Sequence, residues 1–290
     1  MKEFEKGHLL NILSVLMLAV GPLLSKFGLL NLSPAFAAFI NVITIILASF
    51  LFGIVTKTPV KFYFEKNIFL LAICNSLGII FMFLSMDILS PIEIGFIGRF
   101  YTVFAVVLSV VLLKEKLTKQ EVTFILLAII GVFLFMETGG DYRNNLLGSI
   151  FALLYTFFFA LTNIYIKKTM SKQKNSNSIM FSNNVITLIF VMTYGMFIGE
   201  LFREEISFEG IGFIVGSSFL GGFLGTLLLY EALKYLRFSI ANVTRAFSPL
   251  LLAVISYPFF PIEITLKNTL GAILLLGSIL LLAVKDKKQK

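Results

Sequence analysis

Apolar residues are gathered along this chain into ten long runs, which are separated by short stretches rich in charged residues, proline, glycine or asparagine. Each run is about 18–25 residues long, the length that an α-helix needs to cross the hydrocarbon core of a bilayer. The runs cover residues 9–30, 35–56, 67–87, 91–113, 119–137, 146–167, 178–199, 209–233, 239–260 and 267–284. The pattern therefore predicts an all-α membrane protein with ten transmembrane helices.

Lysine and arginine are distributed unevenly between alternate connecting segments. If the N-terminus is inside, the inner segments hold 18 of the 24 basic residues, the outer loops hold three, and three lie within the runs. The outer three are Arg143, Arg203 and Lys267, and the three within the apolar runs are Lys26, Arg99 and Arg245. Because positively charged loops resist translocation, we expect both termini, including the basic tail 285–290, to be cytoplasmic at the plasma (inner) membrane.

Composition supports a membrane protein and excludes several other classes. The 290 residues are 58% hydrophobic and 14% charged, with a mean hydropathy of +0.96, more apolar surface than a soluble domain of this length can bury. The net charge of +8 lies in short tracts between apolar runs, which indicates membrane topology and not a nucleic-acid partner. One cysteine and one histidine exclude an internal disulfide, a thiolate metal cluster and a histidine-rich metal site. No phosphate-binding loop or dinucleotide motif is present, so no cofactor is predicted.

The first apolar run is expected to remain in the mature protein. Ala35-Phe36-Ala37 resembles a signal-peptidase site, but the run from Leu9 to Leu30 is longer than a signal peptide's apolar region. Ser33-Pro34 has the form of a helix start, with a capping serine and proline at the first turn.

The two halves of the chain match each other when the sequence is shifted by 146 residues. Arg99 then meets Arg245, Gly131 meets Gly277, and the helix start at Ser90-Pro91-Ile92-Glu93 meets Ser239, which precedes Asn242 by three residues. Because each half contains five spans, an odd number, the halves would insert with opposite orientations. The sequence thus predicts two inverted five-helix repeats, 1–137 and 146–284, followed by the tail.

Several short motifs in this chain resemble the drug/metabolite transporter superfamily, specifically its ten-span EamA-like branch. Leu112 to Thr118, with the sequence LLKEKLT, is similar to the family's acidic turn after the fourth span, and Glu263-Ile264-Thr265 is a weaker copy. Lys26 and Lys167 resemble basic residues that close the first span of each half, and Ala232-Leu233, 239–247 and Pro249 resemble parts of the eighth and ninth spans. The resemblance implies a small secondary transporter with the fold described above.

The chain also departs from that family pattern. The proline of the family's fourth span is replaced by Thr102 or Val103, and Val20-Gly21-Pro22 stands in place of an aromatic-glycine pair. Arginines at 99 and 245 are not general family features, so they are the clearest clues to this member's cargo.

Arg99 and Arg245 are the first candidates for substrate binding. A charged side chain within the bilayer costs about 2.5–3.5 kcal/mol on insertion scales, so it usually has a function. If both face one cavity, their guanidinium groups could clamp an anionic group. The alternative is that each reaches its nearer interface or binds backbone carbonyls and an acidic neighbour.

Polar neighbours at helical spacing extend the candidate substrate site. Tyr101 and Thr102 follow Arg99, and Asn242 and Ser248 flank Arg245 at three-residue steps. These side chains could hydrogen-bond to a polar cargo, or they could hold helices together in lipid. Asn75, Asn163 and Lys26 are further cavity candidates.

Asp87, Glu93 and Glu231 could carry a coupling proton or bind a coupling cation. Each has a structural alternative: Glu93 completes a capping box with Ser90, Asp87 is expected at the outer interface, and Glu231 can pair with Lys234 one turn away. The small residues Ser217, Gly221 and Gly225 indicate close helix packing, or sliding during transport.

These observations predict a secondary transporter that moves a small polar or anionic metabolite, resembling an amino acid or carboxylate, by alternating access between the two repeats. Phosphorylated or nucleotide-linked metabolites are a second cargo class. Three alternatives remain: a multidrug exporter, a non-transporting membrane scaffold or sensor, and a membrane enzyme, although no acid–base or metal constellation supports catalysis. The expected partners are a small-molecule substrate, a coupling proton or cation, and the lipid bilayer.

Overall fold

The computed structural model describes residues 3–98, 100–113, 118–135, 142–170, 174–201, 207–236, 248–261 and 264–288, and the secondary structure in these ranges is entirely helical. The helices of the first half are α1 (Glu3–Leu29), α2 (Pro34–Val55), α3 (Lys66–Ile88), α4 (Pro91–Ile97), α5 (Phe100–Leu113) and α6 (Lys119–Phe135). Those of the second half are α7 (Tyr142–Thr169), α8 (Ser176–Phe197), α9 (Phe208–Ser217), the π-helix η1 (Ser218–Gly225), α10 (Thr226–Tyr235), α12 (Ser248–Ser256) and α13 (Leu266–Lys288).

The apolar runs in the sequence coincide with these helices. Within the described residues, six helical stretches are long and apolar enough to cross a membrane: α1, α2, α3, α7, α8 and the continuous stretch α9–η1–α10. Shorter apolar helices occupy three of the remaining runs, and of the ninth run, 239–260, the structure describes only the part from Ser248 onward. The multi-pass helical architecture is confirmed, whereas the number of ten crossings stays a prediction.

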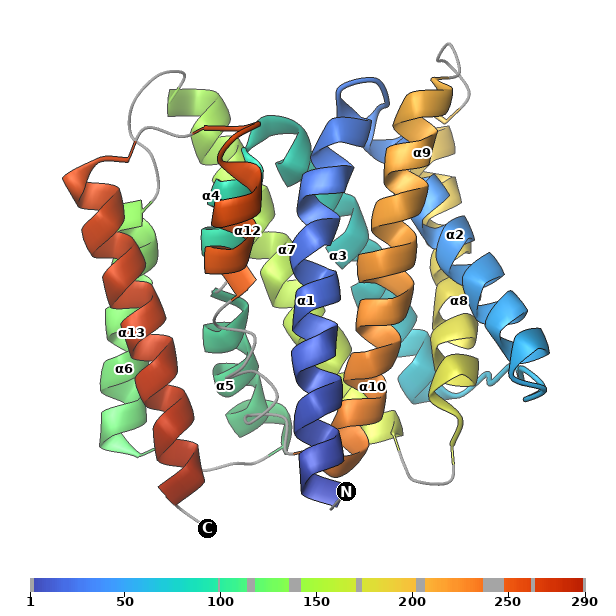
Figure 1. Cartoon of the computed structure of the whole chain (residues 1–290), viewed down its shortest axis with the longest axis horizontal. Helices are drawn as coiled ribbons and strands as arrows, with labels where there is room; N and C mark the ends of the chain where they lie inside the picture. Colours follow the sequence, from blue (N-terminus) through green and yellow to red (C-terminus); the bar gives the residue numbers. More distant parts are fainter. Residues whose placement is uncertain are drawn as a thin grey trace.

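The helices lie side by side with their long axes roughly parallel (Figure 1). α1 packs along α9, η1 and α10, while α3 packs along α7. α2 packs against α8, α4 against α12, and α6 against α13. All of these contacts join the first half of the chain to the second, so the halves are interleaved. The α6–α13 pair stands at one edge of the molecule, and α1 begins at the same end at which α13 finishes (Figure 1).

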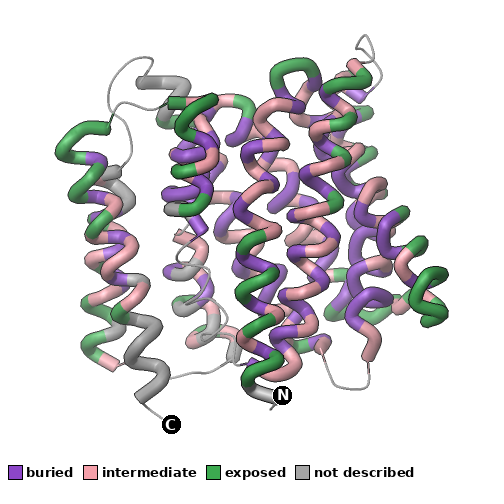
Figure 2. The backbone as a smooth tube through the Cα atoms, in the orientation of Figure 1, coloured by how far each residue is buried: buried purple, intermediate pink, exposed green. Residues whose placement is uncertain are grey.

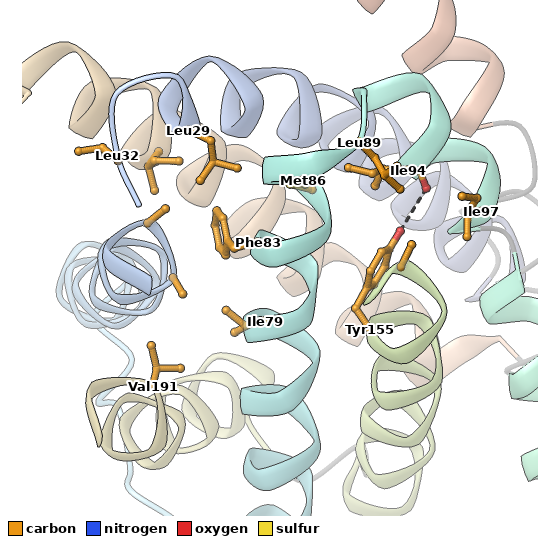
Figure 3. Packing of buried hydrophobic residues seen from close by; sticks show 14 of the residues in the cluster. Leu29, Leu32, Ile79, Phe83, Met86, Leu89, Ile94, Ile97, Tyr155 and Val191 are labelled. Carbon is orange, nitrogen blue, oxygen red and sulfur yellow. Dashed lines mark hydrogen bonds between the residues drawn. The ribbon is translucent and has the colours of Figure 1, made fainter. Parts of the chain in front are cut away.

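Burial alternates around each helix as expected for a bundle in lipid. Large apolar side chains such as Ile54, Ile189 and Val254 are exposed on the outside of the helices, and exposed, intermediate and buried positions alternate along the backbone in Figure 2. One core cluster forms where Ile79 and Phe83 of α3 meet Val191 of α8 and the α1–α2 corner (Figure 3). In hydrocarbon, apolar exteriors cost nothing, so the informative feature is the polar content of the interior.

Two of the long runs are interrupted at positions that matter for the site. The run 91–113 is divided into α4, which ends at Ile97, and α5, which begins at Phe100. The run 209–233 contains the π-helix η1, an element that often marks functional positions because it widens the turn. Both interruptions fall next to a central cavity, and the periodicity of apolar residues predicts neither.

Candidate functional site: a central polar cavity

A cavity of about 260 Å³ lies at the centre of the bundle between the two halves of the chain. Its wall is formed by α1, α2, α3, the α4–α5 junction, α7, α8, and the α9–η1–α10 stretch. The polar side chains among its lining residues are Ser25, Asn41, Asn75, Tyr101, Tyr155, Thr156, Thr162, Asn163, Asn183, Asn184, Ser217, Thr226 and Tyr230. The described lining thus contains amides and hydroxyls but no ionisable acid or base other than the tyrosines.

Five asparagines are the most unusual part of this wall. Asn183 and Asn184 are adjacent on α8 and only 2% and 3% exposed, and Asn41, Asn75 and Asn163 come from α2, α3 and α7. Because an unpaired amide in an apolar interior costs several kcal/mol, such a concentration needs partners or a ligand. Asn75 and Asn163 were expected from the sequence to face a cavity, and both do so.

Close backbone packing gives the cavity its shape on the α1 side. Gly21 of α1 lies against Gly221 of η1, so closely that a Cβ on Gly221 would be 3.5 Å from the Cα of Gly21. Ser25 and Ser217 hydrogen-bond across the same seam with oxygens 2.6 Å apart, and Ser217 Oγ donates to the Gly21 carbonyl at 2.9 Å. The stripe of small residues in the sequence therefore packs η1 against α1.

Aromatic and thioether side chains complete the wall. Tyr155, Phe159 and Tyr230 contribute rings, and Met82 and Met86 of α3 contribute flexible apolar groups. The Tyr155 hydroxyl donates to the carbonyl of Ile94 at 3.1 Å, which ties α7 to α4 (Figure 3). The cavity thus combines a polar belt with aromatic faces, as binding sites for small metabolites commonly do.

Two lysines hold helix ends on either side of the cavity. Lys26, near the end of α1, donates from Nζ to the carbonyls of Met86 and Asp87 at 2.7 and 2.8 Å, at the end of α3. Lys167, near the end of α7, donates to the carbonyls of Leu233 and Leu236 at 2.9 and 3.2 Å, at the end of α10. A cation at a helix C-terminus is favourable because it opposes the negative end of the helix dipole. Lys26 is therefore a helix cap and not a lining residue.

The structure describes only part of the site expected from the sequence. Tyr101 lines the cavity, and Ser248 is buried at the start of α12 but is not among the lining residues. Arg99, Asn242 and Arg245 lie outside the described residues, as does the side chain of Thr102 in α5. Gly98, which precedes Arg99, and Tyr101, two residues after it, both line the cavity.

None of the three carboxylates expected to serve in coupling lines the cavity. Glu93 accepts a hydrogen bond from the Ser90 backbone at 2.7 Å, while Glu93 N–H donates to Ser90 Oγ, so the predicted capping box is present. Glu231 forms a 2.8 Å ion pair with Lys234 on α10, where both residues are half-buried, and Asp87 is exposed at the end of α3. Glu93 and Glu231 thus make the contacts that their structural alternatives require, and the place of Asp87 at the outer interface stays a prediction.

Sequence reasoning missed Asn41, Asn183 and Asn184 as lining residues. The sequence did contain a signal, because these asparagines lie within the apolar runs 35–56 and 178–199. A polar side chain inside a membrane-spanning helix needs a hydrogen-bond partner. The five amides come from four different helices, so only the tertiary structure brings them together.

Comparisons with known proteins agree with the helical architecture. A family model described as the EamA-like transporter family matches this chain twice, over residues 5–136 and 146–284. A solved crystal structure aligns with 99% of this chain and 99% of its own chain, with a TM-score of 0.71 at 11% identity, which shows a shared fold only.

Curated relatives are named as transporters. An uncharacterized transporter from the sor 3′ region of Acidianus ambivalens is 33% identical over 104 residues, which are 36% of this chain and 41% of that protein. An uncharacterized transporter of Haemophilus influenzae is 22% identical over 81% of this chain and 80% of its own length. GDP-fucose transporter 1 of Dictyostelium discoideum is 25% identical over 65% of this chain. The chain thus matches 41% of the first relative's length and 53% of the Dictyostelium protein's length.

Proposed function

Since this chain belongs to the EamA-like transporter family, we propose that its central cavity carries a small polar metabolite across the membrane by alternating access. The family and the transporter names of its relatives make the protein a multi-pass membrane transporter. The cargo class and the mechanism of movement are our proposals, as are the plasma-membrane location and the cytoplasmic termini.

The observation that carries the proposal is the polar cavity, whose wall is formed by both halves of a membrane-spanning chain. Packing alone does not require five asparagines around one space, because apolar side chains would fill it at lower cost. Binding a polar cargo gives those side chains partners, and a site between two halves can open to either side when the halves rock.

The pairing of helices supports two inverted repeats. Exchanging each helix of one half with its counterpart in the other converts the α1 contact with α9–η1–α10 into the α7 contact with α3. The pairs α2–α8 and α6–α13 are unchanged by the same exchange, and α4–α12 joins the fourth apolar run to its counterpart, the ninth. Lys26 and Lys167 also have equivalent roles, each joining the first helix of its half to the end of the third. This is the contact pattern that a pseudo-twofold axis would produce.

The cargo that we favour resembles an amino acid or a carboxylate. Arg99 is next in the chain to Gly98 and close to Tyr101, both lining residues, and a guanidinium there would attract a carboxylate. Coupling to a proton or cation through Asp87, Glu93 or Glu231 stays a prediction, because none of these side chains lines the cavity.

Counterflow into proteoliposomes tests the proposal directly. Vesicles containing the purified protein and an unlabelled metabolite should accumulate the same metabolite in labelled form. Thr162→Phe places a ring in the cavity, so it should reduce the initial rate at least tenfold. Ile189→Phe places the same ring on the exposed face of α8 and should leave the rate unchanged.

The screen should begin with amino acids and their carboxylate analogues. If no member of these classes exchanges, the proposed cargo class is wrong. If a cargo exchanges and the two phenylalanine variants behave alike, the route does not pass through this cavity.

A nucleotide sugar is a second candidate, favoured by the resemblance to GDP-fucose transporter 1. GDP-fucose in the same counterflow assay distinguishes the two. Exchange of GDP-fucose, without exchange of amino acids, would replace the first proposal with the second.

A further inference from the structure

We propose that the asparagine belt of the cavity, defined as Asn41, Asn75, Asn163, Asn183 and Asn184, is a subsite for a protonated amine, bound through the amide carbonyl oxygens. The inference rests on the proposed function in that it assigns a chemical class to the cargo of the same cavity. It follows from the direction in which each lining hydrogen bond runs.

Two amides of the belt are oriented by their own helix. Asn163 Nδ2 donates to the Phe159 carbonyl at 2.9 Å, and Asn184 Nδ2 donates to the Met180 carbonyl at 2.9 Å. A carbonyl can only accept, so the amide nitrogen must face it in each case. The Oδ1 atoms of both residues are left on the opposite side of the amide.

Two further amides are oriented through hydroxyl groups. Asn41 Nδ2 donates to Ser218 Oγ at 2.8 Å, and Ser218 Oγ has already given its proton to the Ile214 carbonyl. In the same way, Asn75 Nδ2 donates to Thr187 Oγ1 at 3.3 Å, and that hydroxyl donates to a carbonyl of α3. Each hydroxyl has one proton and donates it to a carbonyl, so the amide must be the donor in the bond between them.

Six of the eight hydroxyl groups in the described lining, all except those of Tyr101 and Tyr230, follow the same rule. Thr156, Thr162 and Thr226 donate to backbone carbonyls, as do Ser217 and Tyr155. Since Ser217 has given its proton to Gly21, the hydroxyl of Ser25 is the donor in the Ser25–Ser217 pair. These groups therefore offer the cavity lone pairs and no protons.

Two belt oxygens need a donor that the described protein does not supply. Asn183 Oδ1 and Asn184 Oδ1 are both fully buried and have no hydrogen-bond partner among the described residues. Both residues line the cavity. A buried acceptor left unpaired costs about 1–3 kcal/mol. Neither oxygen is exposed to the cavity, so pairing with a ligand N–H group requires these side chains to rotate.

An ammonium group fits this wall better than other polar groups. It has three donors and no lone pair, whereas a hydroxyl brings two lone pairs of its own to a surface already rich in them. A carboxylate brings only acceptors, for which the belt amides offer the N–H groups that their protein contacts leave unused. The rings of Tyr155, Phe159 and Tyr230 in the same wall add attraction for a cation. An amino acid would place its ammonium group at the belt and its carboxylate elsewhere in the cavity.

A matched ligand series separates the ammonium group from the carboxylate. L-Phenylalanine, 2-phenylethylamine and 3-phenylpropionate share one skeleton and carry both groups, the amine alone and the carboxylate alone. Binding is measured as the ligand-dependent rise in the melting temperature of the purified protein, and the apparent Kd is read from its concentration dependence. Counterflow of the same compounds is measured separately.

The test variants replace one belt amide by an apolar side chain of similar size. Asn183→Leu should raise the Kd for 2-phenylethylamine about tenfold or more, because it removes a hydrogen bond to a charged donor. Asn163→Leu is the second test variant if Asn183→Leu does not fold. Among the hydrogen bonds within the described part of the protein, it removes only the one to the Phe159 carbonyl of its own helix.

Asn177→Leu is the control. Asn177 is also on α8 and is 3% exposed, and its Oδ1 has no hydrogen-bond partner among the described residues. Its amide donates to the Ser49 carbonyl at 2.8 Å, and it does not line the cavity. It should lower stability without changing the Kd.

The proposal holds if the amine-bearing compounds stabilise the protein and Asn183→Leu or Asn163→Leu weakens them more than Asn177→Leu does. It is overturned if only 3-phenylpropionate binds, if none of the three binds, or if the belt variants and the control behave alike. Binding of the amines without counterflow would support the subsite and contradict the transport proposal. Counterflow of other cargo without amine binding would support transport and contradict the subsite.

Discussion

At the scale of single residues, Gly98 shows how tightly the cavity wall is built at the α4–α5 junction. A Cβ at this position would lie 2.5 Å from the Tyr155 hydroxyl oxygen and 2.6 Å from the Ile94 carbonyl oxygen. Those two atoms are hydrogen-bonded to each other. Glycine is needed here because the hydroxyl occupies the space that any side chain would use.

Gly98→Ala should therefore destabilise the protein by about 1–3 kcal/mol, as overpacking of a filled core does. Tyr155→Phe should cost less, about 0.5–1.5 kcal/mol, because the Ile94 carbonyl keeps its bond from the Gly98 N–H. The double variant should lose less stability than the two single losses added together, because removing the hydroxyl relieves part of the clash. Thermal unfolding in detergent measures all three, and strict additivity would mean that the hydroxyl does not limit the space at residue 98.

At the scale of helices, the two glycines that match in the repeats have different surroundings. A Cβ on Gly131 of α6 would come within 2.6 Å of the Leu275 backbone nitrogen and 2.9 Å of the Gly271 carbonyl oxygen, both on α13. A Cβ on Gly277 of α13 would meet no atom within 4 Å among those described. The same residue type thus sets a helix separation at one position and merely weakens a helix at the other.

Alanine substitutions at these two positions should have opposite effects. Gly131→Ala should lower stability by about 1–3 kcal/mol because backbone atoms cannot move aside as a flexible side chain does. Gly277→Ala should leave stability unchanged or raise it by up to about 1 kcal/mol, through the better helix propensity of alanine. The shift in melting temperature is the readout, and equal shifts would show that α6 and α13 do not approach as closely as described.

At the scale of the whole molecule, the prediction that both termini are cytoplasmic places each loop on a defined side. The loop after α2 lies at the same end of the bundle as the start of α1, and the start of α13 lies at the other end (Figure 1). Segments rich in lysine and arginine alternate with segments poor in them in the same order.

Cysteine labelling tests this orientation, since Cys74 is the single native cysteine. In a Cys74→Ser background, Ile264→Cys should react with a membrane-impermeant maleimide added to intact cells, and Thr58→Cys should react only after permeabilisation. Both positions are exposed in the structure. The cysteine-free protein is the control for background labelling. The opposite pattern would invert the topology, and equal labelling of both in intact cells would contradict the count of spans between them.

The chain's apolar runs determined the helices and their order, because hydrophobic length and helix-start signals are local properties of a sequence. The capping box of Ser90 and Glu93 and the helix start at Ser33-Pro34 could be read for the same reason. The inverted-repeat relation between the halves stays a prediction from a shared residue spacing.

Only the tertiary structure decided what the polar residues do. The direction of the Asn41 amide depends on Ser218, which is 177 positions away, and the need for Gly98 depends on Tyr155 on another helix. A hydrogen bond has a donor and an acceptor only when both atoms are in place, so the acceptor character of the cavity wall could not be read from one segment at a time. Sequence alone therefore specified a membrane bundle with polar residues inside it, and the packing of distant helices turned those residues into a site with a preferred chemistry.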